Sequence, residues 1–459
     1  MPKGNGLSMT ECNQTAFSFE AHFLRRVEAR FDGSQMTTDG GALLLRAVDK
    51  KIRLLKRVVA CFRDGRDPER IEHVLSELLA QRIYALALGY EDLNDHEELR
   101  HDPLLGLLAG KREWQQPLAG KSTLNRLELT PAEEPHRYHK IRYLAEALDA
   151  LLVEIFLEAH AQPPQEIVLD VDVTDTPLHG EQEARFFHGY YGHYCYLPLY
   201  IFCGEHLLCA RLRPSNQDAS AGSIKEVARI VQQIRQRWPR VRIILRADSG
   251  FCREELMAWC EKQRIEYVLG FARNPLLRRK ITAAMRQAKK EHQRTGKAAR
   301  VFAELSYRTK KSWSCTRRVV AKAEYLEKGE NPRFVVTSLK APAWPAQKLY
   351  EQLYCARGEM ENRIKEQLSL FSDRLSTETM RTNQLRLYFS SLAYVLVHAL
   401  RRLALAGTEW AAAQVQTIRL RLLKIAAEVR FSARRIWVRY SRAWPWKNLF
   451  AVAHAALSG

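Results

Sequence analysis

Two acidic residues, Asp170 and Asp172, close an apolar run at residues 167–173. Apolar, β-branched residues in a short run predict a buried strand. Because side chains alternate between the two faces of a strand, both carboxylates share one face with Val168. Neighbouring carboxylates repel each other, so this arrangement requires a cation or a shared proton to neutralise them.

Two later stretches are suited to meet this strand. The apolar run 241–247 ends in Asp248 and a turn-forming Ser-Gly pair. The stretch 354–365 carries four polar residues spaced three, four and four apart, which places them on one face of a helix. These four residues are Tyr354, Arg357, Glu361 and Lys365.

Asp172 or Asp170, together with Asp248 and Glu361, forms an oxygen-only ligand set. Hard cations such as Mg²⁺ or Mn²⁺ prefer such ligands. The chemistry suited to two such ions is phosphodiester cleavage and transfer, because one ion activates the attacking oxygen and the other stabilises the leaving oxygen. Each acid alone is explained equally well as a strand-end or surface residue, whereas the three together favour a metal site.

The charge balance of the chain indicates a polyanionic partner. Among 459 residues, 72 are Lys or Arg and 52 are Asp or Glu, which gives a formal net charge of +20. Nucleic acid is the partner that this balance favours, and a merely soluble basic protein is the alternative. The nine cysteines contain no Cys-x-x-Cys pair, which favours reduced, intracellular thiols over a disulfide framework or a zinc ribbon.

The sequence predicts no membrane segment and no secretion signal. No uncharged apolar run reaches the roughly 18 residues that a membrane span needs. The longest candidate, 387–400, contains a histidine and is predicted to be a core helix. The N-terminus is not followed by an apolar stretch of the kind that directs secretion.

Length and composition shifts predict two to four structural units of mixed α/β class. Residues 1–160 are predicted to be a mostly α-helical, DNA-binding N-terminal region. Residues 161–275 and 341–406 are predicted to form a mixed sheet covered by helices. Residues 276–340 begin with a basic helix and continue with strand-like pieces, which indicates a β-rich insertion. Residues 407–459 form a basic C-terminal region.

Individual elements are also predicted within these units. Asp39 is placed to cap a helix over 42–51. After the core helix at 376–406, a second helix is predicted over 409–427. The stretch 430–447 then mixes arginines with tryptophans, which suits contact with nucleic-acid backbone and bases. The alternative is that its tryptophans pack on the core.

The stretch Gly120-Lys121-Ser122 is not a nucleotide-binding P-loop, because that pattern needs a glycine at position 115, which is glutamine. A basic turn that enters a helix can nevertheless bind phosphate through its amides and its lysine. Lys121 and Arg126 are therefore candidate contacts to DNA phosphates, and an ordinary capped helix start is the alternative.

The acidic motifs resemble those of the DDE transposases of bacterial insertion sequences of the IS4-like group. The resemblance rests on Asp172-Val173-Thr174, Arg246-Ala247-Asp248-Ser249-Gly250 and Tyr354-x-x-Arg357-x-x-x-Glu361. Stretches at 38–41, 120–126 and 169–180 are similar to the IS1380 family in particular. The resemblance covers nearly the whole chain.

This resemblance implies a ribonuclease H-like catalytic core that binds two Mg²⁺ ions and carries a β-rich insertion before the glutamate. It assigns catalysis and metal binding to Asp172, Asp248 and Glu361, and it favours Asp172 over Asp170 because the family's aspartate precedes a small residue and Thr. Tyr354 matches the helix motif of the family.

Arg357 and Lys365 are the expected phosphate contacts beside the metals. Related enzymes place a lysine seven residues after the glutamate, and this chain has leucine at position 368. Lys365 lies on the same helix face and is the candidate substitute. Related enzymes also flip a DNA base onto a tryptophan of the insertion, and Trp313 is the only tryptophan in 276–340.

The resemblance implies cut-and-paste DNA transposition. Cleavage at the ends of the element frees a 3′-hydroxyl, which then attacks another phosphodiester. The expected partners are the terminal inverted repeats of the element and target DNA, bound by a dimer at the nucleoid in a bacterial cytoplasm. Two other functions remain open: a ribonuclease H-like nuclease that cuts without joining, and a non-enzymatic DNA-binding protein.

Overall fold

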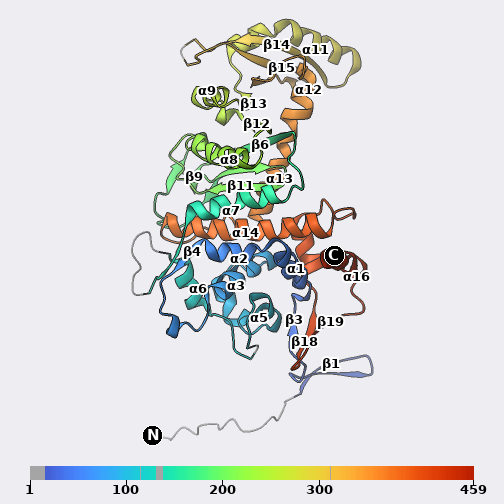
Figure 1. The fold of residues 1–459 in the computed structure, drawn as a ribbon. Helices are drawn as coiled ribbons and strands as arrows, with labels where there is room; N and C mark the ends of the chain where they lie inside the picture. The colour runs from blue at the N-terminus through green and yellow to red at the C-terminus, as the bar shows by residue number, and fades with distance from the viewer. Residues whose placement is uncertain (1–15, 114, 131–137, 311) are drawn as a thin grey trace, which may run out of the picture.

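The structure is a computed structural model that describes residues 16–113, 115–130, 138–310 and 312–459. The first 15 residues of the predicted N-terminal region lie outside the described residues. The long helix α14 (Met380–Ala404) separates two parts of the molecule. Helices α1 to α6 lie on one side of it, and the main sheet lies on the other side (Figure 1).

The main sheet mixes parallel and antiparallel strands. Strand β6 pairs antiparallel with β10 and parallel with β12, and β12 pairs parallel with β13. Three antiparallel strands followed by two parallel ones form the ribonuclease H-like core that the resemblance implies, and the mixed α/β class is confirmed. The order across the sheet is β11 (His206–Arg211), β10 (Leu199–Cys203), β6 (Glu166–Val173), β12 (Arg242–Ala247), β13 (Glu266–Phe271), β17 (Arg333–Thr337), β15 (Arg317–Leu326) and β14 (Ala299–Tyr307).

The predicted insertion continues this sheet. It begins with helices α10 (Pro275–Lys280) and α11 (Thr282–Thr295) and then supplies β14, β15, β16 (Gly329–Glu330) and β17. Strand β17 pairs antiparallel with β13 of the core, so the β-rich stretch extends the edge of the catalytic sheet. Its treatment as a separate unit stays a prediction.

The N-terminal region contains a group of helices and several short strands, and its role as a separate DNA-binding unit stays a prediction. Its main helices are α1 (Leu43–Ile52), α2 (Leu54–Ala60), α3 (Leu75–Leu88), α5 (Pro103–Ala109), α6 (Lys121–Glu128) and α7 (Ala145–Glu158). Most of α3 is buried, and α14 is buried along nearly its whole length. The stretch 387–400 is therefore a core helix, as predicted. No helix within the described ranges is long and apolar enough to cross a membrane.

Strands from the N-terminal and the C-terminal parts of the chain meet in a small sheet. Strand β3 (Met36–Thr37) pairs with β18 (Ala427–Phe431), which pairs in turn with β19 (Ile436–Tyr440). The helix predicted over 409–427 is wrong. That stretch holds only the short turns α15 (Val415–Ile418) and η7 (Arg419–Leu423), because its end is drawn into long-range pairing with the N-terminal strand.

The motif at 38–41 joins these two parts. Asp39 makes no side-chain cap, contrary to the prediction; it contacts Lys424 at 2.8 Å and accepts a hydrogen bond from Tyr90 at 2.8 Å. A Cβ atom on Gly41 would lie 1.9 Å from the Leu422 carbonyl oxygen, so only glycine permits this contact. The motif is explained by packing of one part on the other.

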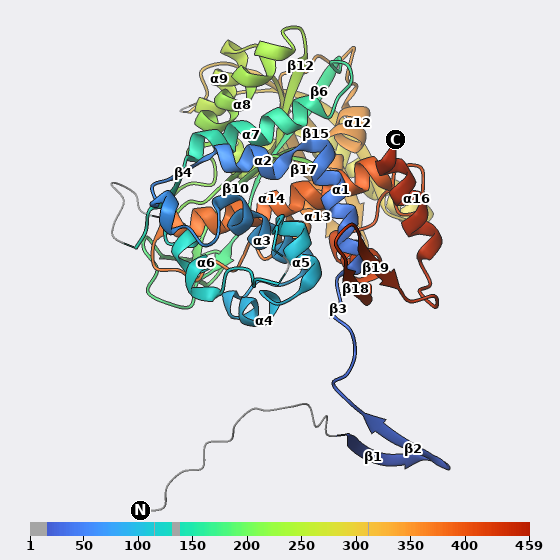
Figure 2. The same cartoon turned by 60° about the horizontal axis from the view of Figure 1, so that its bottom comes forward.

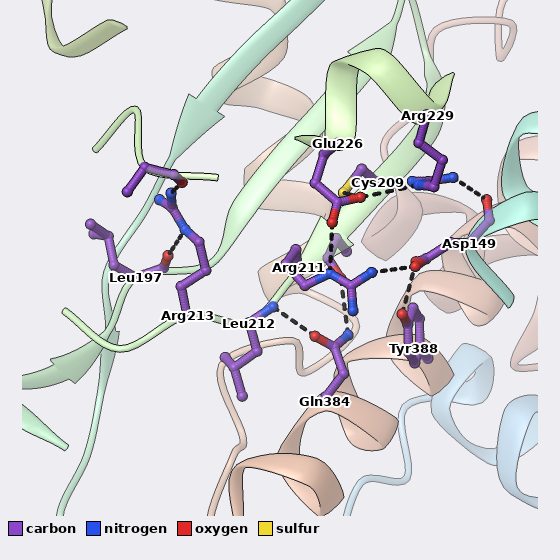
Figure 3. Close-up of polar contacts among 12 residues, drawn as sticks. Asp149, Leu197, Cys209, Arg211, Leu212, Arg213, Glu226, Arg229, Gln384 and Tyr388 are labelled. Carbon is purple, nitrogen blue, oxygen red and sulfur yellow. Dashed lines mark hydrogen bonds and ion pairs between the residues drawn. The ribbon is translucent and has the colours of Figure 1, made fainter. Parts of the chain in front are cut away.

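A buried polar network fastens the helices to the sheet (Figure 3). Arg211 of β11 contacts Asp149 of α7 through Nη2 and Glu226 through Nε, the latter at 3.2 Å. Glu226 belongs to α8 (Ser223–Arg237) and also accepts from Arg229 at 3.1 Å. Tyr388 of α14 donates to Asp149 at 2.8 Å. Four elements thus share one set of charges.

Removal of Arg211 should destabilise the fold. In Arg211→Ala the Asp149 carboxylate, whose residue is 1% exposed, loses its main counter-charge, and breaking a buried pair in this way costs about 3–5 kcal/mol. The thermal unfolding midpoint should fall by several degrees. The control Arg294→Ala removes a partner from an exposed pair with Glu291 and should leave the midpoint unchanged. Equal midpoints for both variants would contradict this role for the network.

Candidate active site

The pairing of β6 with β12 brings two predicted site residues together. Ala247 pairs with Val171, so the next residues in the same register are Asp248 and Asp172. Asp248 then starts the turn η4 (Ser249–Phe251), and its Oδ1 accepts a hydrogen bond from the Gly250 amide at 2.8 Å. The turn fixes this carboxylate at the end of the strand.

The third acid comes from a continuous helical stretch. It consists of α12 (Ala346–Lys348), the π-helical turn η5 (Leu349–Tyr354), the 3₁₀ turn η6 (Cys355–Arg357) and α13 (Gly358–Leu368). Buried apolar residues of η5 pack on the face of the sheet that also carries Asp170 and Asp172; these are Leu349, Tyr350 and Leu353. This packing places Arg357 and Glu361 over the strand ends. The predicted single helix is confirmed in outline, with a change of helical pitch just before the site.

Arg357 connects two of the three acids. Its Nη1 donates to Asp172 Oδ2 at 2.9 Å, and its Nη2 donates to Glu361 Oε1 at 3.1 Å. The Asp172 side chain is 14% exposed, whereas the Glu361 side chain is 53% exposed. One guanidinium therefore links a mostly covered carboxylate to an exposed one.

The electrostatics show that the negative charge of Asp172 is unfavourably placed. Burial raises the pKa of Asp172 to about 6, Arg357 opposes this shift, and the charges of Asp248 and Glu361 add to it. Burial and the neighbouring Asp248 also contribute to a raised pKa of the Tyr354 hydroxyl. A site that strains a carboxylate in this way is suited to a cation.

The donor chemistry fits divalent metal ions. In the part of the chain that the structure describes, no three His, Cys, Asp or Glu side chains stand close enough to hold an ion as they are placed. Arg357 pairs with both Asp172 and Glu361, so its guanidinium supplies positive charge to these two carboxylates. Carboxylate oxygens, such as those of Asp172, Asp248 and Glu361, are the ligands that Mg²⁺ and Mn²⁺ prefer.

Asp170 has a different partner from Asp172. Arg246 of β12 contacts both of its oxygens, at 2.5 and 2.7 Å, and donates to the Leu353 carbonyl at 2.5 Å. Both side chains of the pair are buried. Asp170 therefore anchors η5 to the sheet, which leaves Asp172 as the better placed of the two candidate ligands. The arginine of the Arg-Ala-Asp motif has a positioning role that the sequence did not reveal.

Gly270 is a second residue that sequence reasoning missed. A Cβ atom at this position of β13 would lie 2.5 Å from Tyr354 Oη and 2.8 Å from the Ser249 amide nitrogen. Only glycine lets β13, the Asp248 turn and Tyr354 approach so closely. Lys365 lies one turn beyond Glu361 in α13 and is exposed, as a contact to DNA requires.

Glu366 is a third residue that sequence reasoning missed, and it holds α13 in place. It is 3% exposed and accepts hydrogen bonds from Arg363 and Arg401, each at 2.8 Å, and from the Val415 amide at 3.1 Å. Arg401 belongs to α14, so the helix that carries Glu361 is tied to the central helix of the molecule.

Trp313 lies inside the fold. It is 5% exposed, its ring centroid lies 5.1 Å from that of Phe271 and 5.8 Å from that of Tyr307, and Arg317 stacks over it. In this conformation it is not presented to DNA. Its role in binding a flipped base stays a prediction and requires the side chain to leave this cluster.

Lys121 and Arg126 lie in α6, across α14 from the acids (Figure 1). The Lys121 amide donates to Glu97 at 2.9 Å, and its Nζ donates to Asn94 at 3.2 Å. Protein groups thus already satisfy this helix start, which agrees with the capped-helix alternative. Arg126 lies 6.0 Å from the ring centroid of Tyr138. Their contact to DNA stays a prediction.

A basic groove of about 710 Å³ lies between α5 and the β18–β19 hairpin. Its charged lining consists of Arg100, Lys111, Arg112, Arg434 and Arg435, with Asp102 as its acid. Asp102 is engaged in capping α5. Trp446 packs against Trp410, as the alternative of core packing expects, whereas Trp437 of β19 is 46% exposed and its contact with nucleic acid stays a prediction.

The raised pKa of Asp172 predicts how metal-free stability depends on pH. Its folded-state pKa of about 6 lies above the ordinary value of 3.8, so the folded state binds more protons than the unfolded state between these values. Stability contributed by this proton is therefore complete below about pH 4 and is lost as pH rises through 6. Without metal at pH 7.5, Asp172→Asn should gain on the order of 2 kcal/mol.

Thermal unfolding in a chelator, followed from pH 4 to pH 8, measures this difference. The gain of Asp172→Asn should shrink toward pH 4, and the exposed control Glu327→Gln should follow the wild type. A variant that is less stable than the wild type at pH 7.5 would show that the Asp172 charge is not strained.

Comparison with known proteins gives the family of the chain. A family model described as transposase DDE domain group 1 matches residues 19–459. No curated protein matches the chain. The cryo-EM structure of the piggyBac transposase synaptic complex with hairpin DNA is similar, with 9% identity and a TM-score of 0.42 over 92% of this chain and 81% of that chain. A likeness this distant carries no argument about function. The chain belongs to the transposase DDE domain group 1 family and is a DNA transposase.

Proposed function

We propose that Asp172, Asp248 and Glu361 hold two divalent ions, Mg²⁺ or Mn²⁺, and that this site cuts DNA at the ends of the enzyme's own element and joins the freed ends to target DNA. The observation that carries the proposal is that Arg357 bridges the carboxylates of Asp172 and Glu361, while the strand register places Asp248 beside Asp172, whose carboxylate is partly buried and has a raised pKa. We further propose that the chain belongs to the IS1380 family of transposases.

The protein's own residues have distinct parts in this reaction. Bound ions would activate the attacking oxygen and stabilise the leaving oxygen. Arg357 and Lys365 hold the phosphates of the reacting strand, where negative charge builds up in the transition state. Arg357 would have to release Asp172 and Glu361 as ions bind, which makes it available to the DNA. Tyr354 supports the Asp248 turn through its approach to Gly270.

The basic groove is the surface that we propose for the duplex ends. It lies on the opposite side of α14 from the acids and contains arginines from both the helical region and the C-terminal hairpin. Contacts to phosphate fix the position of a protein on DNA. We further propose that two copies act together on two terminal inverted repeats, at the nucleoid of a bacterial cytoplasm.

Incubation of the purified enzyme with the DNA that flanks its own gene tests the reaction. With Mg²⁺ the wild type should yield cut ends and joined product. Glu361→Gln should bind the same DNA with unchanged affinity and yield neither product, because it removes a ligand charge but keeps the side-chain shape.

The same assay separates the alternatives. Metal-dependent cuts without joined product would favour a nuclease. Binding without any cut in Mg²⁺ or Mn²⁺ would favour a DNA-binding protein and would contradict the proposal. Loss of DNA binding in Glu361→Gln would contradict the assignment of this residue to catalysis.

The double variant Arg434→Glu, Arg435→Glu should weaken binding to the element ends. Two lost phosphate contacts should lower the slope of log affinity against log salt by about 1.8. A matched control is Arg240→Glu, Lys262→Glu, which reverses two exposed charges beside α8 and at the end of α9 (Glu254–Lys262). Binding measured by fluorescence anisotropy over a salt series gives both slopes. Equal slopes for the two double variants would exclude the groove as the duplex site.

A further inference from the structure

A short antiparallel sheet follows the strand that carries Asp172. Its strands are β7 (Thr176–Pro177), β9 (His193–Tyr196) and β8 (Phe186–His188), with β9 in the centre. Val173 of β6 pairs with Leu199 of β10. Three residues farther along each strand, Thr176 pairs with Tyr196, so the register is unbroken. One ribbon therefore extends beyond the end of the main sheet where Asp172 lies.

The hairpin formed by β8 and β9 presents aromatic rings to solvent. We refer to residues 186–194 as the aromatic hairpin. Phe187 is 57% exposed and Tyr190 is 87% exposed, and Phe186 and Tyr194 are also exposed. Phe187 pairs with Tyr194 across the strands, and their ring centroids lie 5.7 Å apart in an edge-to-face arrangement. Exposed apolar patches on a folded protein mark interaction sites.

Two of these rings lie on the face of the ribbon that carries Asp172. Tyr200 of β10 pairs with Asp172 and therefore shares its face. Tyr196 is buried in the same core cluster as Tyr200, so the face continues into β9. Since side chains alternate, Tyr194 is on this face as well, together with its pairing partner Phe187.

The aromatic hairpin is held beside the acids. His193 Nε2 lies 2.8 Å from Asp175 Oδ2, and Asp175 belongs to the segment directly after Asp172. Burial and the charges of Asp175 and Asp172 raise the pKa of Tyr191 to about 12. The turn of the hairpin therefore lies within the electrostatic field of the site.

The charge around the rings suits a nucleic acid. Residues 184–204 contain no acidic side chain. The guanidinium of Arg185 lies 4.7 Å from the ring centroid of Tyr194 and also pairs with Glu181. Aromatic rings beside cations are the means by which proteins hold single strands, because the cations attract the backbone and the rings stack on bases.

The reaction of a transposase supplies a ligand for such rings. A cut strand ends in a base that has lost its stacking neighbour across the cut, whereas bases inside an intact duplex are stacked on both sides. An aromatic side chain can replace the lost neighbour, and this stacking tolerates any base because every base has a π-face. A strand cut at the three acids would release its end next to the aromatic hairpin.

We propose that Phe187 and Tyr194 stack on unpaired DNA bases at the strand end that the three acids hold. Tyr190, in the turn between β8 and β9, extends this stacking surface. The inference deepens the proposed function and rests on it, because it requires the acids to hold the cut strand. It assigns a base contact to the aromatic hairpin, whereas Trp313 is 5% exposed and is not presented to DNA.

Binding of single strands by the full-length protein tests this stacking. A short strand of thymidines and an abasic strand of equal length have the same phosphates, so the ratio of their affinities reports contacts to bases alone. Fluorescence anisotropy in a chelator, where no strand is cut, gives both affinities. The wild type should bind the thymidine strand at least about tenfold more tightly than the abasic strand. The variant Phe187→Ala, Tyr194→Ala should lose most of this preference.

Two control variants separate the hairpin rings from other rings and other groups. Phe19→Ala, Phe31→Ala removes two exposed rings at the hairpin of β1 (Phe17–His22) and β2 (Arg25–Ala29), which stands apart from the folded body (Figures 1 and 2). It should keep the wild-type preference. Tyr194→Phe keeps the ring without its hydroxyl and should keep the preference as well. Equal affinity of the wild type for the two strands would overturn the proposal, and so would an unchanged preference in Phe187→Ala, Tyr194→Ala.

A crosslink in the wild type locates the contact without any variant. A 5-iodouracil base placed at the freed 3′ end of cut element DNA crosslinks under ultraviolet light to an aromatic side chain that it touches. Mass spectrometry of the digested protein should place the crosslink within 186–194. Crosslinks confined to other segments, such as those around Trp313 or Trp437, would overturn the proposal.

These outcomes are distinct from a failure of the proposed function. Wild-type protein that prefers the thymidine strand through the aromatic hairpin but makes no metal-dependent cut would contradict the catalytic site and leave the stacking surface intact. Wild-type protein that cuts and joins its own ends but binds both single strands alike would do the reverse.

Discussion

The rest of this site depends on the contact of Arg357 with Asp172 and Glu361. Its guanidinium balances the negative charge of both carboxylates. Three carboxylates are forced together by the register of two parallel strands and by a helix that crosses their ends. Burial raises the pKa of Asp172 to about 6, and repulsion from the charges of Asp248 and Glu361 adds to this shift. The guanidinium offsets that repulsion in the free protein and leaves a site prepared for metal ions.

The surrounding structure keeps Asp172, Arg357 and Glu361 in place. The buried Asp170–Arg246 pair holds η5 against the sheet on one side of the site. Glu366 joins α13 to α14 on the other side, and α14 in turn contacts the Asp149 network that ties the helical region to the sheet. The catalytic helix is thus fixed at both ends by buried ion pairs. Such pairs are strongly destabilising when one partner is removed, which makes them effective in positioning.

The acids, their strands and their helix could be predicted from the sequence because each follows from local pattern: an apolar run that ends in aspartate, or polar residues at helical spacing. Asp170 could not be separated from Asp172 by the residues alone, since its partner Arg246 lies on another strand. Trp313 was the only tryptophan of its segment, yet aromatic neighbours from β13 and β14 bury it. The sequence wrongly predicted a helix over 409–427 and did not reveal that position 270 requires glycine, and both errors have the same cause. Both depend on contacts between segments that are distant in the sequence.

Joint binding of metal by Asp172, Asp248 and Glu361 can be tested by cleavage of the polypeptide itself. Fe²⁺ in place of Mg²⁺, with ascorbate and peroxide, produces hydroxyl radicals that cut a polypeptide backbone beside the bound ion. If these three residues bind the ion, cuts should appear near residues 172, 248 and 361; excess Mg²⁺ should suppress them, and they should be absent in Asp172→Asn. Cuts confined to other segments, or an unchanged pattern in that variant, would contradict it.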